Sequence, residues 1–218
     1  MIDDTSSPGA AGMDPLSGFS PAARDWFAAS FPAPTPVQSA AWDAIRAGGS
    51  TLVIAPTGSG KTLAAFMHAI DRLFAERPRE ADRTAPAGTR VLYISPLKAL
   101  GADVQKNLRL PLCGIAEQRE RRGDPAGTIS VGMRTGDTPA SERAALVRRP
   151  PDILITTPES LYLMLTSKAR ETLREVDTVI IDEIHAVAGT KRGAHLALSL
   201  ERLDMLLPAP AQRVGLSA

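Results

Sequence analysis

The chain has 218 residues, with 25 Lys and Arg against 24 Asp and Glu, and one cysteine, Cys113. This length supports one α/β domain with a sizeable core, and a net charge of +1 means that any nucleic-acid surface must be a local patch. The lone cysteine excludes an internal disulfide and a cysteine zinc cluster, and 4% aromatic residues argue against a stacking platform for single strands. No run approaches the ~18 apolar residues of a membrane span. We therefore expect no membrane contact and, by default, a cytoplasmic protein.

The N-terminal segment divides into a leader and the start of the folded domain. Residues 1–18 are rich in Asp, Ser, Gly and Pro, which predicts a disordered leader before a domain over residues 19–218. A helix is expected from the cap Ser20 to Ser30, and a second one from the cap Thr35 onwards. Gln38, just inside the second helix, can donate and accept at once, as the N6/N7 edge of adenine requires. We expect it to read the base of a nucleotide.

A phosphate-binding loop follows the apolar strand expected over Thr51 to Ile54. Its sequence, Ala-Pro-Thr-Gly-Ser-Gly-Lys-Thr, leads into apolar residues at helical spacing, which indicates strand, loop and helix. The first position is Ala55, where the general pattern has Gly. Glycines let successive N–H groups face an anion, and the helix start adds positive partial charge. This pattern predicts that ATP binds here, through Thr57, Gly58, Ser59, Gly60, Lys61 and Thr62.

Within that loop two side chains have separate expected roles. Lys61 supplies a point charge for the β- and γ-phosphates, and the hydroxyl of Thr62 is suited to bind the Mg²⁺ that bridges them.

The middle of the chain predicts further strands that each end in a polar motif. Residues 76–89 read as a surface connection, and Arg90 to Ser95 as a second buried strand. The carboxyl ends of parallel strands form the binding edge of such a sheet, which places Pro96 and Lys98 where a nucleic-acid phosphate can lie. Residues 115–127 read as a polar insertion with solvated arginines.

Two more strands are expected to present helix starts at the same edge. A third strand, residues 128–133, leads to Arg134, Thr135 and Gly136, and a helix is expected over residues 139–147. A fourth strand, Ile153 to Thr156, leads to a helix start with free N–H groups and an outward hydroxyl. Two helix starts that can each bind an anion favour a nucleic-acid backbone lying across this edge. We expect it to be bound by Arg134, Thr135, Gly136, Thr157, Pro158 and Glu159.

A pair of acids follows the fifth expected strand, Asp177 to Ile181. A carboxylate at the tip of a central strand can hold Mg²⁺, and its neighbour can deprotonate an attacking water. We assign Asp182 to the metal and Glu183 to the base. His185 lies beside them and is a candidate to relay the γ-phosphate state to neighbouring elements.

The last part of the chain predicts a helix after Lys191-Arg192-Gly193 and a sixth strand over Gln212 to Ser217. A domain rarely ends on a core strand, so a truncated C-terminal end is expected. The elements together predict an α/β fold, a mostly parallel sheet with helices on both faces.

These motifs, in this order, resemble the first motor domain of a superfamily 2 helicase. Ser-Pro-Leu-Lys-Ala-Leu from Ser95, Thr-Pro-Glu-Ser-Leu from Thr157 and Asp-Glu-Ile-His-Ala-Val from Asp182 resemble the large helicase-related (Lhr) family of DNA helicases. The resemblance implies a RecA-like P-loop NTPase domain, 3′-to-5′ movement on single-stranded DNA, displacement of DNA or RNA, and DNA repair. Gly215 to Ala218 resembles the start of the Ser-Ala-Thr motif, without its threonine.

The same resemblance implies a second RecA-like domain in the parent chain, which supplies an arginine finger worth roughly 10³ to 10⁵ in rate. The 218-residue chain is therefore expected to bind ATP·Mg²⁺ weakly, hydrolyse it slowly and not unwind DNA.

Three other functions remain open from the sequence. An RNA helicase is one, since one sequence does not reveal the 2′-OH contact that separates the two polymers. A non-catalytic ATP-binding scaffold is another, although it would have no need of a base at Glu183. A phosphotransferase would leave the strand-end motifs unexplained.

Overall fold

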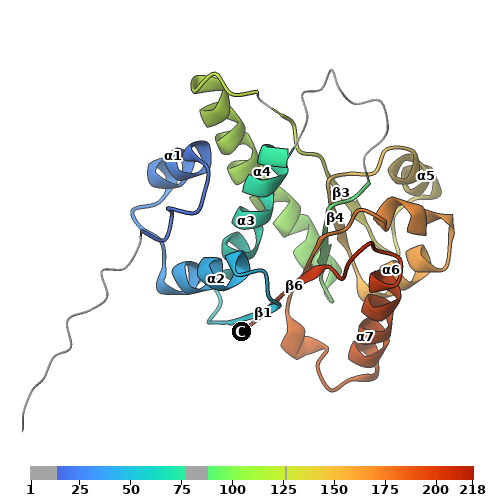
Figure 1. Ribbon diagram of the computed structural model, residues 1–218. Coiled ribbons are helices and arrows are strands. Elements are labelled where there is room, and N and C mark those ends of the chain that lie inside the picture. The colour runs from blue at the N-terminus through green and yellow to red at the C-terminus, as the bar shows by residue number, and fades with distance from the viewer. Residues whose placement is uncertain (1–13, 77–87, 126) are drawn as a thin grey trace, which may run out of the picture.

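A six-stranded sheet forms the centre of the protein. The computed structural model describes residues 14–76, 88–125 and 127–218, and the side chains of residues 98–100 and 102 are left out of the description (Figure 1). Every strand pair is parallel, in the order β1-β6-β5-β2-β4-β3. The strands are β1 Thr51–Ile54, β2 Val91–Ile94, β3 Val131–Arg134, β4 Ile153–Thr156, β5 Thr178–Ile181 and β6 Gln212–Ser217.

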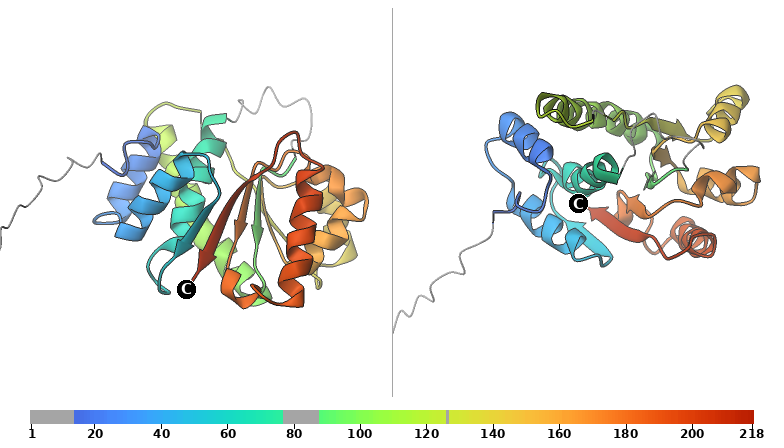
Figure 2. Two further views of the ribbon diagram at one scale, coloured as in Figure 1. Left: turned by 60° about the horizontal axis from the view of Figure 1, so that its bottom comes forward. Right: turned by 45° about the horizontal axis from the view of Figure 1, so that its top comes forward.

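Helices cover both faces of this sheet (Figure 2). They are α1 Pro21–Ser30, α2 Pro36–Arg46, α3 Lys61–Glu76, α4 Lys98–Arg121, α5 Ala140–Arg148, α6 Pro158–Leu165, η2 Lys168–Leu173, η3 Ile184–Ala186 and α7 Lys191–Asp204. The connections between successive strands carry α3 to α7, as parallel pairing requires, and α1 and α2 precede β1. In the described ranges, no helix is both long and apolar enough for a bilayer crossing.

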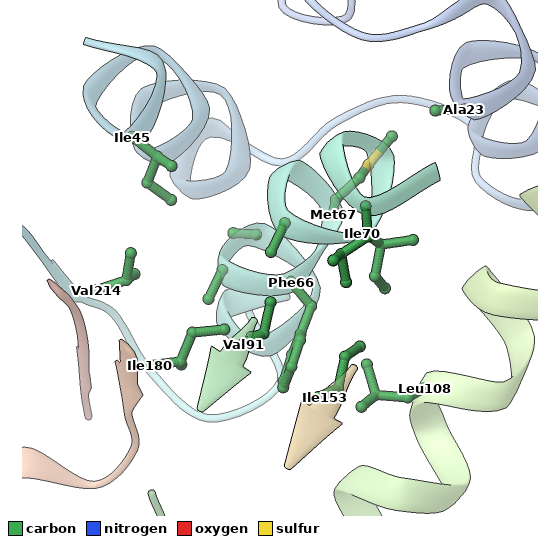
Figure 3. Packing of buried hydrophobic residues seen from close by; sticks show 14 of the residues in the cluster. Ala23, Ile45, Phe66, Met67, Ile70, Val91, Leu108, Ile153, Ile180 and Val214 are labelled. Atoms are coloured by element: carbon green, nitrogen blue, oxygen red, sulfur yellow. The ribbon is translucent and has the colours of Figure 1, made fainter. Parts of the chain in front are cut away.

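Alternate residues along a strand belong to two separate hydrophobic cores, because successive side chains point to opposite faces of the sheet. On β2, Val91 and Tyr93 join the core under α1 to α4, whereas Leu92 and Ile94 join the core under α6, η2 and α7. Figure 3 shows the first core, with Phe66 of α3 between that helix and the strands. Both faces of the central strands are buried, which explains their uninterrupted apolar sequences.

The predicted order of elements is confirmed. Strands over 51–54, 153–156 and 212–217 have the predicted bounds, and the other three differ by one to three residues at an end. The predicted leader is wrong in its last five residues, because residues 14–18 form a turn and Leu16 packs against the first core. Residues 1–13, and residues 77–87 of the predicted surface connection, lie outside the described residues.

The predicted insertion over residues 115–127 is also wrong in its first half, because α4 continues through it to Arg121. The helix contains Pro111, which typically costs ~3 kcal/mol in a helix interior. Leu108 and Ile115, one turn to either side, are 3% and 0% exposed in the first core. Their burial offsets the missing hydrogen bond, and α4 contacts both the helix α1 and the strands β3 and β4.

Candidate nucleotide and nucleic-acid site

The phosphate loop forms as predicted at the carboxyl end of β1. Gly58 and Gly60 have φ angles of +82° and +87°, which residues with a Cβ rarely adopt. The loop turns directly into α3, which begins at Lys61, so the first N–H groups of a 16-residue helix point back into the loop. The hydroxyl oxygen of Ser59 is buried without a hydrogen-bond partner in the described structure. These features together suit an anion with several oxygens.

The side chain of Lys61 is folded onto its own loop. Its Nζ donates to the carbonyl oxygen of Pro56 at 2.8 Å and to that of Ala55. Two neutral carbonyls are weaker partners for an ammonium than phosphate oxygens, because the phosphate carries an opposite charge and adds a Coulomb attraction to the hydrogen bond. A bound triphosphate would therefore draw Lys61 away from these carbonyls.

The predicted base reader, Gln38, is buried beside the phosphate loop. It is 4% exposed, its Oε1 accepts from the N–H of Thr35 at 3.0 Å, and its Nε2 is 3.5 Å from the carbonyl oxygen of Gly60. The hydroxyl of Thr35 donates to the carbonyl oxygen of Ser59 at 3.0 Å. Thr35 and Gln38 form a reciprocal capping box, which Thr-x-x-Gln in the sequence signals. They brace the phosphate loop, and the contact of Gln38 with adenine stays a prediction.

The predicted metal ligand, Asp182, lies at the tip of β5. Its Oδ1 accepts from the N–H of Glu183 at 2.9 Å, and its Oδ2 accepts from the hydroxyl of Tyr93 on the neighbouring strand β2. Burial, followed by the charge of Asp182, raises the pKa of Tyr93 well above its usual range. The phenol therefore stays protonated and is the donor in this pair.

The predicted base, Glu183, has the only positive φ of a non-glycine residue in the described ranges, with φ 49° and ψ 46°. This left-handed conformation is unfavourable for a residue with a Cβ by roughly 1 to 2 kcal/mol. It turns the chain after β5 into η3. Strain of this kind persists where a site needs it.

His185 links the acidic turn to the last strand. Its Nε2 is 3.2 Å from Oε2 of Glu183, and its Nδ1 is 3.2 Å from the hydroxyl oxygen of Ser217. The N–H of Ala218 also donates to Nδ1 at 3.4 Å. An amide N–H only donates, so Nδ1 accepts and the ring proton on Nε2 faces Glu183. His185 therefore lies beside the predicted base, and its role as a relay stays a prediction.

The residues predicted to bind nucleic acid lie at the same sheet edge, at the ends of β2, β3 and β4. Pro96 is buried, and Lys98 begins α4. Burial, followed by repulsion from Arg143, lowers the pKa of the half-buried guanidinium of Arg134. Gly136 is exposed, and its carbonyl oxygen accepts from Arg143 at 2.7 Å. These positions agree with a shared edge.

The outward hydroxyl expected at the start of α6 is wrong. Thr157 is 4% exposed, and its Oγ1 accepts from the N–H of Ser160 as the helix cap. Thr135 is likewise 9% exposed, and its Oγ1 accepts from the N–H of Asp137. In both turns the hydroxyl oxygen already accepts a hydrogen bond from a nearby backbone N–H. The groups that could contact a phosphate here are therefore the free N–H groups at the helix starts.

Glu159, next in the same motif, is paired with an arginine that the sequence did not single out. Nε and Nη2 of Arg192 donate to the two carboxylate oxygens at 2.5 and 3.0 Å. The hydrogen bond from Arg192 lowers the pKa of Glu159. Pro158, beside it, is buried. The pair joins the first turns of α6 and α7, and it neutralises a carboxylate that would otherwise repel a phosphate.

Oxygen donors of the kind that Mg²⁺ prefers are present at this edge. The hydroxyl of Thr62 stands in the first turn of α3 and the carboxylate of Asp182 at the end of β5. The described ranges hold no group of three or more His, Cys, Asp or Glu residues that could hold a metal ion. Mg²⁺ keeps several waters and is usually bound through one or two carboxylates plus substrate phosphates, so this donor set fits it in company with a nucleotide.

A phosphate loop and an Asp-Glu-x-His turn on one edge of a parallel sheet define a RecA-like nucleotide-binding domain of the helicase type. Residues 35–218 match the family model of the DEAD/DEAH box helicases. The chain belongs to the DEAD/DEAH box helicase family.

Within that family the chain is similar to Lhr helicases, which confirms the resemblance seen in the sequence. It is 65% identical over 207 residues to "Lhr helicase/probable uracil glycosylase" of Mycolicibacterium smegmatis and 66% identical over 203 residues to "Lhr helicase/uracil glycosylase" of Escherichia coli. These alignments cover 95% and 92% of this chain and 13% of each relative. The solved structure of Mycobacterium smegmatis Lhr bound to ssDNA and AMP-PNP superposes with a TM-score of 0.88 at 64% identity, over 94% of this chain and 25% of that one.

Three side chains of the site were missed from the sequence: Tyr93, Thr35 as a brace, and Arg192. Tyr93 had a signal, because it is the one residue with a polar group in the strand Val-Leu-Tyr-Ile. A buried phenol needs a partner, but nothing in the sequence identifies that partner, which is 89 residues away. Arg192 and Glu159 are 33 residues apart, and only the packing of α6 on α7 joins them.

Proposed function

We propose that this domain binds ATP with Mg²⁺ and single-stranded DNA. In the whole protein, a second RecA-like domain would complete the ATPase and couple hydrolysis to 3′-to-5′ movement and duplex unwinding, in DNA repair in the cytoplasm. The likeness to M. smegmatis Lhr, a structure described as bound to ssDNA and AMP-PNP, supports this choice of ligands. DNA-RNA hybrids are proposed as further substrates.

One observation carries the proposal: the phosphate loop and the Asp182-Glu183 turn leave the same edge of the sheet with only β6 between them. Ile54 pairs with Ser217, and Gly215 pairs with Ile181. Neighbouring strands are ~4.8 Å apart, so β1 and β5 are separated by roughly 10 Å. A nucleotide held by its phosphates in the loop of β1 would therefore present its terminal phosphate toward the acids of β5.

The residues of the phosphate loop and of the acidic turn then each have a chemical role. Lys61 would leave the loop carbonyls and balance charge on the β- and γ-phosphates. Asp182 and Thr62 would hold Mg²⁺, which neutralises charge on the phosphate oxygens when it is bound. Glu183 would accept a proton from the attacking water, and the Nε2–H of His185 would hold the Glu183 carboxylate in place.

Nucleic acid would lie along the other half of the same edge. The ends of β2, β4 and β3 follow β5 in the sheet and lead into the N-termini of α4, α6 and α5. Helix N-termini attract phosphate through free N–H groups and positive partial charge, without reading base sequence. We propose that a single strand crosses these starts through Pro96, Lys98, Arg134, Thr135, Gly136, Thr157, Pro158 and Glu159.

Equilibrium binding of a fluorescent ATP analogue and of matched labelled DNA and RNA strands tests this function. We expect Mg²⁺-dependent nucleotide binding and salt-sensitive DNA binding, since each released counterion steepens the salt dependence. Tighter binding of RNA than of the matched DNA would replace DNA with RNA as the proposed polymer. Nucleotide binding that does not respond to Mg²⁺ would contradict the assignment of the site.

A further inference from the structure

Tyr93 lies in the middle of the sheet, on the strand next to the acidic turn. Its backbone is paired with Ile180 of β5 on one side and Ile155 of β4 on the other. The side chain is 0% exposed and belongs to the core under α3. A tyrosine at such a position is unusual, because a buried hydroxyl without a partner costs ~1 to 3 kcal/mol where a phenylalanine costs nothing.

The ring of Tyr93 is held against the helix that carries the phosphate loop. It stacks on Phe66 of α3, with ring centroids 5.2 Å apart and an interplanar angle of 27°. Phe66 is also 0% exposed and lies five residues after Lys61. The stack fixes the ring between β2 and α3, which restricts rotation of the side chain and so the partners that the hydroxyl can reach.

The partner of that hydroxyl is Oδ2 of Asp182. The other oxygen of the same carboxylate accepts from the N–H of Glu183 at 2.9 Å. Two donors from different segments therefore fix the rotation of one carboxylate. Each carboxylate oxygen offers two lone pairs, so one on each oxygen is left for a further contact.

We propose that Tyr93 is a positioning residue that acts through Asp182: its hydroxyl holds the carboxylate in the orientation that receives Mg²⁺ with the nucleotide. The inference rests on the proposed nucleotide site and adds a residue outside the phosphate loop and the acidic turn. Hydrogen bonds to a ligating carboxylate orient it, and their removal typically costs 10- to 100-fold in metal affinity or activity. The stack on Phe66 extends this support to α3, which carries Lys61.

The test is Tyr93→Phe, which keeps the ring and its stack and removes one hydroxyl. The binding of a fluorescent ATP analogue to the chain is measured while Mg²⁺ is titrated. We expect the half-saturating Mg²⁺ concentration to rise about 10-fold. Nucleotide affinity at saturating Mg²⁺ and the thermal unfolding midpoint should change little. A residue that only filled the core would leave the Mg²⁺ requirement unaltered, because phenylalanine fills the same space.

The chain offers a matched control, because Tyr162 is its other tyrosine and lies on α6, where its ring contacts that of His195 at a tilted angle. Tyr162→Phe should leave the Mg²⁺ titration unchanged. In an Asp182→Asn background, Tyr93→Phe should add no further shift, since the carboxylate through which it acts is gone.

Three results would overturn the inference: an unshifted Mg²⁺ titration for Tyr93→Phe, the same shift for Tyr162→Phe, or a full further shift in the Asp182→Asn background. If the unchanged chain shows no Mg²⁺-dependent nucleotide binding, the proposed function and this inference fail together. If the unchanged chain binds with Mg²⁺ and Tyr93→Phe behaves identically, only this inference fails.

Discussion

Nε2 of His185 lies 3.2 Å from Oε2 of Glu183, while the opposite nitrogen of the same ring faces Ser217 at the end of β6. The imidazole therefore connects the proposed base to the strand that lies between the phosphate loop and the acidic turn. A base that must accept a proton from a positioned water depends on such a contact, because a displacement of 1 Å can cost about 10²-fold in rate.

Replacement of this histidine should therefore separate binding from hydrolysis. We expect His185→Asn to change nucleotide affinity by no more than about twofold, because the ring contacts the carboxylate of Glu183 and not the phosphate loop. The ATP hydrolysis rate should fall by roughly 10- to 100-fold. His195→Asn, on α7, is the matched control and should leave both quantities unchanged. A loss of affinity as large as the loss of rate would show that His185 supports the fold of the site and not the base.

The left-handed backbone of Glu183 predicts that some substitutions here stabilise the fold while they abolish hydrolysis. Glu183→Gly and Glu183→Ala both remove the carboxylate, but only glycine adopts φ 49° without strain. The glycine variant should therefore unfold with a free energy about 1 kcal/mol higher than the alanine variant, measured by urea denaturation. Both variants should lose hydrolysis. Equal stability of the two would contradict a strained turn at this residue.

The pairing of Glu159 with Arg192 predicts a small, pH-dependent contribution to stability. The pKa of Glu159 is lower in the folded protein than in the unfolded chain, so its contribution is complete above the unfolded pKa and disappears as the pH falls through the folded one. Glu159 is more than half exposed, which limits the effect to about 0.5 kcal/mol. Glu159→Gln should lower the unfolding free energy by this amount at neutral pH.

The same comparison at a pH below the folded pKa of Glu159 should show no difference between the variant and the unchanged chain. Glu117→Gln, an exposed glutamate on α4, is the control for a change of net charge. A destabilisation by Glu159→Gln that persists at acidic pH would mean that the carboxylate contributes through packing and not through its charge.

Local patterns in the sequence predicted most of this fold because the strands are short apolar runs with clear punctuation. Ile153–Thr156 and Gln212–Ser217 have their predicted bounds, and α3 begins at the lysine of the phosphate loop. The patterns failed where packing overrides local preference. Helix α4 continues past Pro111 and through polar residues because the side chains of Leu108 and Ile115 are buried.

The candidate site was predictable where one motif contains both the loop and its chemistry, as in Gly58 to Thr62 and Asp182 to His185. Contacts between distant segments were not predictable. The hydroxyl of Tyr93 reaches Asp182, and Arg192 reaches Glu159, only because neighbouring strands and helices bring them together. The hydroxyl of Thr157 was expected to face outward, but it caps the start of α6, which is a local alternative for such side chains, and Gln38 likewise bonds to the start of its own helix.

The central claim is that the phosphate loop and the acidic turn serve one nucleotide, and the binding of ATP·Mg²⁺ to two variants tests it most directly. We predict that Lys61→Ala abolishes or severely weakens nucleotide binding, whereas Glu183→Gln keeps binding and lowers hydrolysis by roughly 10²- to 10⁴-fold. Lys168→Ala, in η2, controls for the loss of one positive charge and should bind like the unchanged chain. Equal nucleotide affinity of the unchanged chain and Lys61→Ala would contradict the account.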